Sequence, residues 1–236
     1  MVMSIPASGD NGPIIDNTVY AHLLKAHVAD GLVDYDGFKT DGEKLDDYLK
    51  VLSKVKPETL TEPAAFAFYI NAYNAWTIKL ILTGYPGVTS IKNLGSLLRS
   101  PWKKELARID GRMVTLDQIE HDILRPRFKD PRVHFAINCA ALSCPPLRPE
   151  PYTEDRLEQQ LEDATIRFIN SPDRNYLKDD TLYVSKIFKW FNEDFNGDVP
   201  GFMKKYARGT LKQSLDGAGG PLKIKYLHYD WSLNRK

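Results

Sequence analysis

Apolar residues recur at helical spacing in the first third of the chain. Between Asn17 and Val28, and again between Asp41 and Val55, they lie three or four positions apart, which predicts two amphipathic helices. The segment from Pro63 to Leu82 differs because it has almost no polar face. A helix that is apolar all round is normally covered on several sides, so we expect this segment to be the central helix of the fold.

In the middle of the chain, the spacing of the apolar residues becomes that of β-strands. Apolar residues at 106–109 and 113–114 flank Asp110-Gly111, which is a strong signal for a two-residue β-turn and predicts a hairpin. Thr115-Leu-Asp-Gln118 follows and has the pattern of a capping box. It predicts a helix that ends near Pro126, because proline interrupts the hydrogen-bond ladder of an α-helix.

The last part of the chain predicts one long helix and several short elements. Residues 133–139 form a short apolar run typical of a buried strand, and Thr153 is the expected N-cap of a helix that extends to Asn170. The remaining predictions are a strand at 182–184, helices at 187–195, 199–206 and 211–215, and a half-buried strand at 222–229. Together these elements predict an α+β fold, with helices packed on a small, mainly antiparallel sheet.

The distribution of residue types predicts one domain with a short tail. Residues 1–15 are rich in Gly, Pro, Ser and Asp, and we expect them to be a flexible tail. Residues 16–236 contain no internal repeat, no low-complexity linker and no convincing interior boundary. This length is sufficient to bury a sizeable core, so we expect a single α+β domain over 16–236.

Charge and hydropathy remove several classes of function. The 32 Lys and Arg residues nearly balance the 31 Asp and Glu residues, so the net charge of +1 gives no case for nucleic acid as a partner. No apolar stretch approaches the roughly 20 residues of a membrane span. The first residues lack the basic and apolar regions of a signal peptide, so we expect either an intracellular protein or the mature form of an exported, periplasmic protein.

Candidate chemistry concentrates in the segment 134–147, which contains both cysteines of the chain. Cys144 is the first choice for a nucleophile, because the two prolines after it stiffen the backbone and a turn there is expected to be accessible. Cys139 ends the apolar run, where it is either a packed thiol or a resolving partner for Cys144. Only four residues separate the two cysteines, and a disulfide between them is geometrically feasible.

A cysteine nucleophile needs a base, and two histidines are candidates. Alternation along a strand places His134 on the face opposite Cys139, although the turn could bring Cys144 back towards it. His121 lies on the capped helix beside Glu120, at the border of the apolar face. A carboxylate there is costly without a partner, so Glu120 is a candidate to orient an imidazole or to bind a substrate amine. Structural roles are the alternative for all three side chains.

Two amides lie inside the most apolar helix. Buried amides must find several hydrogen-bond partners, so Asn71 and Asn74 either tie this helix to its neighbours or reach a substrate in the cleft. The two histidines and two cysteines above are suitable zinc ligands, but their spacings match no common zinc pattern. Phosphate-loop and dinucleotide fingerprints are absent as well, so no metal and no cofactor is expected.

Five separated motifs agree in order with a known family. They are FYINAYNA (68–75), LDQIEHDILR (116–125), HFAINCAALSCPPLR (134–148), KIFKWFNEDF (186–195) and YDWSLN (229–234). From about residue 19 to residue 234 the chain resembles the domain of unknown function 547 family. The resemblance implies a fold distantly similar to papain-like and transglutaminase-like thiol enzymes. It also implies that bacterial relatives are often exported.

The leading expectation is a thiol-dependent enzyme of papain-like type, either a hydrolase or a transferase. It would act by covalent catalysis on an amide, a peptide or a small thiol peptide such as glutathione. Cys144 would attack, His134 or His121 would take the proton, and Glu120 or Asn71 would orient the base. Two alternatives stay open: a noncatalytic peptide-binding module, and a thiol-disulfide redox protein that uses both cysteines.

Overall fold

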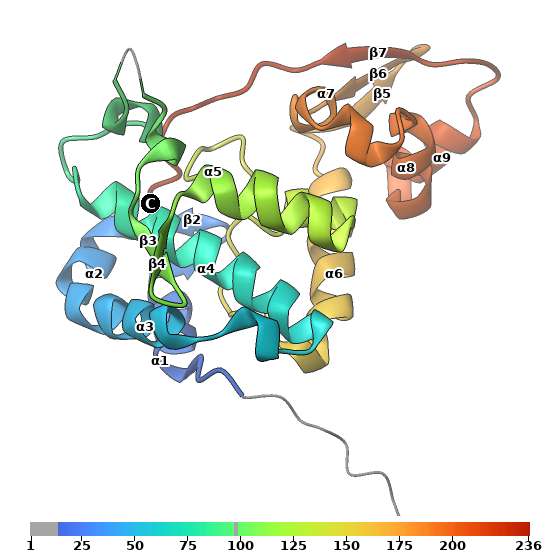
Figure 1. Cartoon of the computed structure of the whole chain (residues 1–236). Helices are drawn as coiled ribbons and strands as arrows, with labels where there is room; N and C mark the ends of the chain where they lie inside the picture. Colours follow the sequence, from blue (N-terminus) through green and yellow to red (C-terminus); the bar gives the residue numbers. More distant parts are fainter. Residues whose placement is uncertain (1–13, 97–98) are drawn as a thin grey trace, which may run out of the picture.

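The computed structural model describes residues 14–96 and 99–236 (Figure 1). The tail predicted over residues 1–15 lies outside this range except for its last two residues. The fold is of the α+β class, as predicted, with most of the chain in helices and seven short strands in the described part. No helix within these two ranges is both long enough and apolar enough to cross a membrane.

The N-terminal elements surround one long helix. They are α1 (Thr18–His27), β1 (Val28–Ala29), β2 (Leu32–Val33), α2 (Tyr35–Thr40), α3 (Gly42–Lys54), η1 (Pro57–Thr59) and α4 (Glu62–Leu82). Helices α2 and α3 pack against α4, and α1 packs against α3 (Figure 1). Every residue of α4 from Ala65 to Ile81 except Lys79 is buried, which confirms the prediction of a central helix.

A hairpin and a second helix follow after the short 3₁₀ segments η2 (Ile91–Leu94) and η3 (Pro101–Lys103). Strands β3 (Ala107–Ile109) and β4 (Arg112–Val114) pair antiparallel, and the two turn residues between them both have positive φ, as this tight turn requires. Thr115 and Gln118 form the predicted capping box at the start of α5 (Leu116–Gln118).

The helix ends close to Pro126, as predicted, but the proline itself lies inside it. Helix α5 continues as the π-helix η4 (Ile119–Phe128), which passes through Pro126 and ends where Lys129 adopts a left-handed φ of 51°. The wider turn of a π-helix moves the carbonyl that would clash with the proline ring in an α-helix. The helix therefore keeps its course for a further half turn beyond the predicted end.

No strand forms over residues 133–139, so this prediction was wrong. Residues Pro131–Phe135 form the 3₁₀-helix η5, and the chain then continues without regular structure. Instead of a neighbouring strand, the side chain of Asn74 on α4 bonds this stretch, through the carbonyl of Ala136 at 3.0 Å and the N–H of Asn138 at 2.8 Å. Strand alternation therefore gives no information about the relative directions of His134 and Cys139.

The C-terminal elements lead away from α4, and those from β5 onward gather at the opposite end of the molecule from α1–α3 (Figure 1). They are η6 (Glu154–Arg156), α6 (Leu157–Ile169), β5 (Tyr176–Lys178), β6 (Thr181–Val184), α7 (Ile187–Trp190), η7 (Asn192–Phe195), α8 (Val199–Tyr206), α9 (Gly209–Asp216) and β7 (Lys223–Tyr226). Strand β6 pairs antiparallel with β5 and parallel with β7. The helix predicted over 187–195 is divided into α7 and η7, and Thr153 makes no side-chain cap bond.

Two hydrophobic clusters form the core. One surrounds α4, and the other is rich in phenylalanine and joins α6 to the C-terminal elements. After β7, the chain returns to the first cluster and ends beside β2, where Asn234 accepts a hydrogen bond from the N–H of Val33 at 2.8 Å (Figure 1). The two clusters meet along this returning segment, and the candidate site lies at their junction.

Candidate functional site

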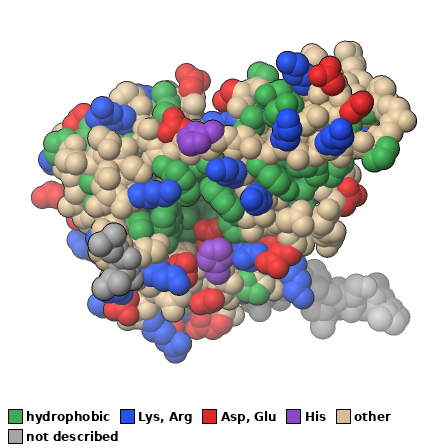
Figure 2. All heavy atoms as spheres, turned by 90° about the horizontal axis from the view of Figure 1, so that it is seen from above, with side chains coloured by type: hydrophobic (Ala, Val, Ile, Leu, Met, Phe, Trp, Pro, Cys, Tyr) green, Lys and Arg blue, Asp and Glu red, His purple; other side chains and the backbone are tan. Residues whose placement is uncertain are grey.

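A cavity of about 210 Å³ opens between α5 and η4, the cysteine-bearing segment and the C-terminal segment. Side chains from both core clusters line it. Its aromatic side chains are Tyr73, Trp102, Trp190, Phe191, Tyr229 and Trp231, its titratable ones include Asp117, Glu120, His121 and His134, and its sulfurs belong to Cys139 and Cys144. Figure 2 shows the hollow from above. The structure thus brings together five of the seven site residues that the sequence predicts.

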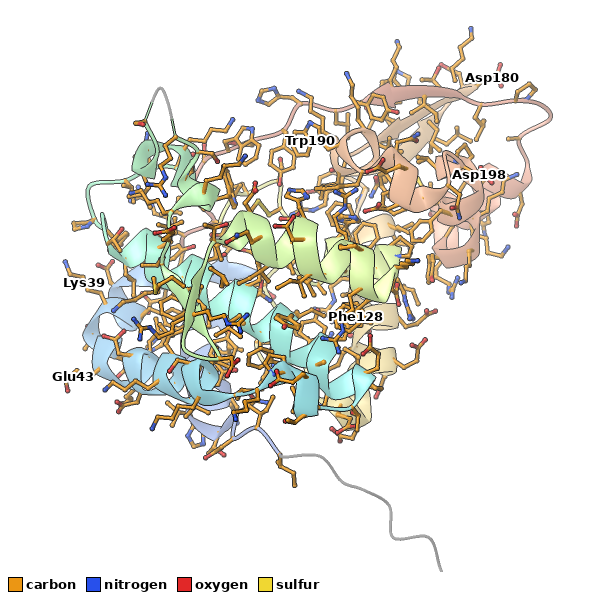
Figure 3. The ribbon with its side chains drawn as sticks, viewed as in Figure 1. Lys39, Glu43, Phe128, Asp180, Trp190 and Asp198 are labelled. Atoms are coloured by element: carbon orange, nitrogen blue, oxygen red, sulfur yellow. A yellow bond between two sulfur atoms is a disulfide. The ribbon has the colours of Figure 1, made fainter. Side chains whose placement is uncertain are left out.

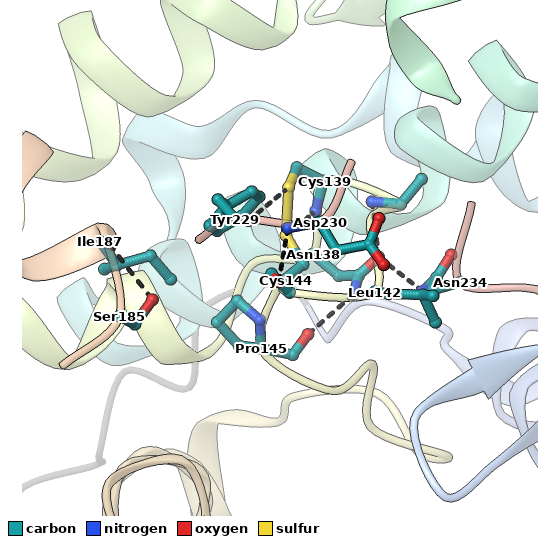
Figure 4. The surroundings of a disulfide bond; sticks show 12 residues. Asn138, Cys139, Leu142, Cys144, Pro145, Ser185, Ile187, Tyr229, Asp230 and Asn234 are labelled. Atoms are coloured by element: carbon teal, nitrogen blue, oxygen red, sulfur yellow. Dashed lines mark hydrogen bonds between the residues drawn. A yellow bond between two sulfur atoms is a disulfide. The ribbon is translucent and has the colours of Figure 1, made fainter. Parts of the chain in front are cut away.

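The two cysteines form a disulfide, so neither is a free thiol. Cys144 is only 4% exposed, whereas Cys139 is partly exposed. The backbone N–H of Cys139 donates to Sγ of Cys144 at 2.8 Å, and the hydroxyl of Tyr229 lies 3.3 Å from Sγ of Cys139 (Figure 4). The expectation that Cys144 is the accessible cysteine was wrong, because Cys139 is the more exposed of the two.

Contacts from two other parts of the chain cover Cys144 and fix the loop between the cysteines. The N–H of Leu142 donates to Ser232 at 2.8 Å, and the guanidinium of Arg174 donates to the carbonyl of Cys144 at 2.9 Å. Ala140 adopts a left-handed φ of 61°, which is unfavourable for a residue with a Cβ. Bonds from outside the loop therefore hold the two sulfurs in place.

His134 is paired with a carboxylate, Asp194, that was not among the predicted site residues. Its Nε2 lies 2.6 Å from Oδ2 of Asp194, which belongs to η7, and its ring stacks on Phe191 with centroids 3.9 Å apart. Because a carboxylate only accepts, Nε2 carries the hydrogen. The other nitrogen, Nδ1, is buried and has no hydrogen-bond partner within the described part of the chain. His134 lines the cavity, and its buried Nδ1 is left without a partner.

Asp194 is itself held by Arg125, whose Nε and Nη2 donate to its two oxygens at 2.7 and 3.0 Å. Burial raises the pKa of Asp194, but the hydrogen bonds from His134 and Arg125 lower it by more, so the net pKa is well below its usual range. Asp194 is therefore ionised at neutral pH. It fixes the orientation of the imidazole.

Arg125 also connects the second histidine to this network. Its Nη1 donates to Nδ1 of His121 at 3.0 Å, and its Nη2 donates to Glu193 at 2.6 Å. Because arginine is always a donor, this bond leaves the hydrogen of neutral His121 on Nε2. His121 is exposed, so it lies at the opening of the cavity rather than at its wall.

Glu120 is buried, as its position on the apolar border predicts, but its partner is Tyr73. Burial raises the pKa of Tyr73 well above its usual value, and the charge and hydrogen bond of Glu120 add to this effect. The phenol therefore stays protonated and donates to the carboxylate. The expectation that Glu120 or Asn71 orients the base is not met, because Asp194 is the group that bonds His134.

The two amides of α4 act within the protein. Asn71 donates to the carbonyl of Tyr152 at 2.7 Å and accepts from its N–H at 2.9 Å, and Asn74 holds the cysteine-bearing segment as described above. Neither lines the cavity, so their predicted contact with substrate has no support and the predicted structural role is the one observed. Across residues 14–96 and 99–236, no three His, Cys, Asp or Glu side chains converge as metal ligands do.

Comparisons with known proteins extend this description. A family model described as a protein of unknown function, DUF547, matches residues 57–169, which include α4, the hairpin, both histidines of the cavity and both cysteines. Asp194 and the aromatic residues of the C-terminal segment lie beyond the matched range. No curated protein and no solved structure matches the chain. The chain is thus similar to the DUF547 family over slightly less than half of its length.

Proposed function

We propose that the protein carries out thiol–disulfide exchange with a small thiol peptide and that Cys139–Cys144 is its reactive disulfide. One observation carries this proposal. The disulfide lies in the wall of a cavity that also contains an oriented imidazole, His134, with a buried and unpartnered nitrogen. A disulfide that only stabilises the fold needs neither a cavity nor a base beside it.

The first step is attack on the sulfur of Cys139, the more exposed of the two cysteines. Nδ1 of His134 takes the proton of the substrate thiol, and the resulting thiolate attacks Sγ of Cys139. The disulfide breaks, its electron pair moves to Sγ of Cys144, and a mixed disulfide remains on Cys139. The N–H of Cys139 points at the leaving sulfur at 2.8 Å and stabilises its negative charge until the imidazolium returns the proton.

A second substrate thiolate completes the reaction. It attacks the substrate sulfur of the mixed disulfide and releases Cys139 as a thiolate, which takes up the second proton. Two substrate thiols are then oxidised to one disulfide, and the protein disulfide is reduced to two thiols. The aromatic side chains of the cavity suit this role, because they bind the apolar and amide parts of a peptide while its thiol faces the sulfur.

A stopped-flow experiment tests the proposal. The oxidised protein is mixed with glutathione, and the reaction is quenched with an alkylating reagent. Mass spectrometry then counts the free thiols of the protein from the number of alkyl groups added. We expect two thiols to appear, and we expect the rate to fall about 100-fold in His134→Gln, as for loss of a general base. The matched control is His22→Gln, an exposed histidine of α1 far from the cavity. Equal rates in the two variants, or two free thiols before glutathione is added, would refute the proposal.

A second candidate function uses the same dyad after reduction. A free Cys144 with His134 and Asp194 has the nucleophile, base and orienting carboxylate of a cysteine-dependent acyl transferase or hydrolase. The N–H that Cys139 directs at Cys144 favours the thiolate of this nucleophile. This candidate agrees with the papain-like resemblance of the sequence.

The two candidate functions require different redox states of the cysteines, so the choice of buffer separates them. Acyl transfer predicts cleavage of amide or ester substrates in reducing buffer only, and loss of that cleavage in Cys144→Ala but not in Cys139→Ala. If wild type and Cys144→Ala are alkylated equally near neutral pH after reduction, the nucleophile is not activated. Peptide binding without either reaction would leave the protein as a noncatalytic binding module.

A further inference from the structure

Two lysines lie next to residues that line one edge of the cavity. Nζ of Lys92 lies 3.9 Å from the ring centroid of Trp231, whose side chain lines the cavity. Lys186 immediately precedes Ile187, which also lines it. Partial burial lowers the pKa of Lys92, and the charge of the nearby Lys186 lowers it further. Lys186 lies one helical turn before Trp190, whose ring centroid is 5.7 Å from that of Trp231, so both lysines adjoin the same pair of tryptophans.

Neither ammonium group is neutralised within the part of the chain that the structure describes. Other cations beside lining residues of the cavity are paired: Lys103 lies 3.9 Å from Asp117, and Arg125 bonds both Glu193 and Asp194. Figure 2 shows Lys and Arg side chains gathered around the hollow. Adjacent like charges without a counter-ion create a local positive potential, and this potential attracts an anion.

A continuous series of contacts leads from these lysines to the disulfide. The ring of Trp231, under Lys92, lies 4.6 Å from that of Tyr229, and the hydroxyl of Tyr229 lies 3.3 Å from Sγ of Cys139. Trp190 extends from α7 towards the main body of the molecule and contacts both rings (Figure 3). The cations and the accessible sulfur thus lie at the two ends of one aromatic wall.

We propose that Lys92 and Lys186 form an anion subsite, which binds a carboxylate of the thiol substrate while the aromatic wall binds its peptide groups. The proposal rests on the exchange function and makes it specific: the substrate is a small peptide thiol with a free carboxylate, and neutral thiols are poor substrates. Trp231 positions the Lys92 ammonium and covers the stem of the ligand.

A binding experiment tests the subsite without any thiol chemistry. S-methylglutathione, which has two carboxylates and no free thiol, is titrated into the oxidised protein, and tryptophan fluorescence reports binding at the aromatic wall. The test variant is Lys92→Gln/Lys186→Gln. The matched control is Lys189→Gln/Lys225→Gln, which removes the same charge from two lysines that lie over Tyr226 and Tyr183, outside the cavity.

We expect the Kd of S-methylglutathione to rise about tenfold in the test variant and to stay unchanged in the control, since each exposed ion pair contributes modestly. The dimethyl ester, whose carboxylates are blocked, is expected to bind all three proteins equally and more weakly than the acid binds wild type. Raising NaCl from about 0.05 to about 0.5 M is expected to weaken acid binding to wild type but not to the test variant.

Three results would overturn the subsite: equal Kd values in the test and control variants, equal affinity of acid and ester, or no binding of the acid to wild type. The binding assay involves no thiol chemistry, so its outcome can be distinguished from a failure of the exchange function. If S-methylglutathione shows the expected pattern but glutathione does not reduce the disulfide, the exchange function fails while the anion subsite stands.

Discussion

Asp194→Asn tests whether the carboxylate that bonds His134 matters to both stability and reaction. Asp194 accepts three hydrogen bonds, one from His134 and two from Arg125. Asparagine keeps one oxygen but replaces the other with an NH₂ group. This group then faces an N–H donor of His134 or Arg125 and cannot accept its hydrogen bond. Hydrogen bonds to charged groups contribute about 1.5–3 kcal/mol each, and Arg125 keeps its bond to Glu193, so we expect a loss of about 2–3 kcal/mol in the free energy of unfolding.

Urea unfolding of wild type and variant measures this loss, and the stopped-flow assay with glutathione measures the rate. We expect the exchange rate to fall about 100-fold, because the imidazole loses its orientation and the stabilisation of its protonated form. The control is Glu193→Gln, whose carboxylate also bonds Arg125 but is 78% exposed. An exposed ion pair contributes less than about 1 kcal/mol, and we expect no change in rate.

The pH dependence of the two proteins adds an independent check. The folded protein lowers the pKa of Asp194, so this group stabilises the fold fully above its unfolded pKa of about 4 and loses that contribution as the pH falls further. The difference in stability between wild type and Asp194→Asn is therefore expected to shrink below about pH 4. The reasoning is refuted if Asp194→Asn and Glu193→Gln have the same stability and the same rate at neutral pH.

Three further predictions concern the surroundings of the site. Asn74→Ala removes two buried bonds to the cysteine-bearing segment and is expected to destabilise the fold by about 2–4 kcal/mol in urea; a loss under about 0.5 kcal/mol would mean that the amide does not hold the segment. Cys139→Ser/Cys144→Ser opens a short loop and is expected to cost about 2 kcal/mol in nonreducing buffer, with no difference from wild type once dithiothreitol is present. Trp190→Ala, at a side chain 44% exposed, is expected to weaken S-methylglutathione binding about tenfold with little change in Tm; unaltered binding would exclude Trp190 from the ligand site.

Much of the helical framework could be predicted because its signals are local. The apolar period of α1 and α3, the absence of a polar face on α4 and the capping box before α5 each depend on residues within a few turns of one another. The Asp110-Gly111 turn is equally local. The strand predicted over residues 133–139 was wrong because its apolar pattern indicates burial but not the backbone partner. The segment is buried, and the amide of Asn74 bonds its backbone instead of a neighbouring strand.

The candidate site could be predicted only in part for a similar reason. The cysteines and His134 lie in one segment, and His121 and Glu120 lie on a helix with a clear apolar border, so residue type and spacing identify them. Asp194 is sixty positions from its partner and sits between an exposed Glu193 and a buried Phe195, in a pattern that is ordinary for a surface turn. Its place in the KIFKWFNEDF motif was the one available signal.

The position of the first adduct tests the central claim most directly. Oxidised protein is mixed briefly with glutathione, the remaining thiols are alkylated, and peptide mass spectrometry locates each modification. We expect glutathione on Cys139 and the alkyl group on Cys144, because Cys139 is the more exposed cysteine and its N–H stabilises the departing Cys144 thiolate. Glutathione on Cys144, or a disulfide that stays intact, would contradict it.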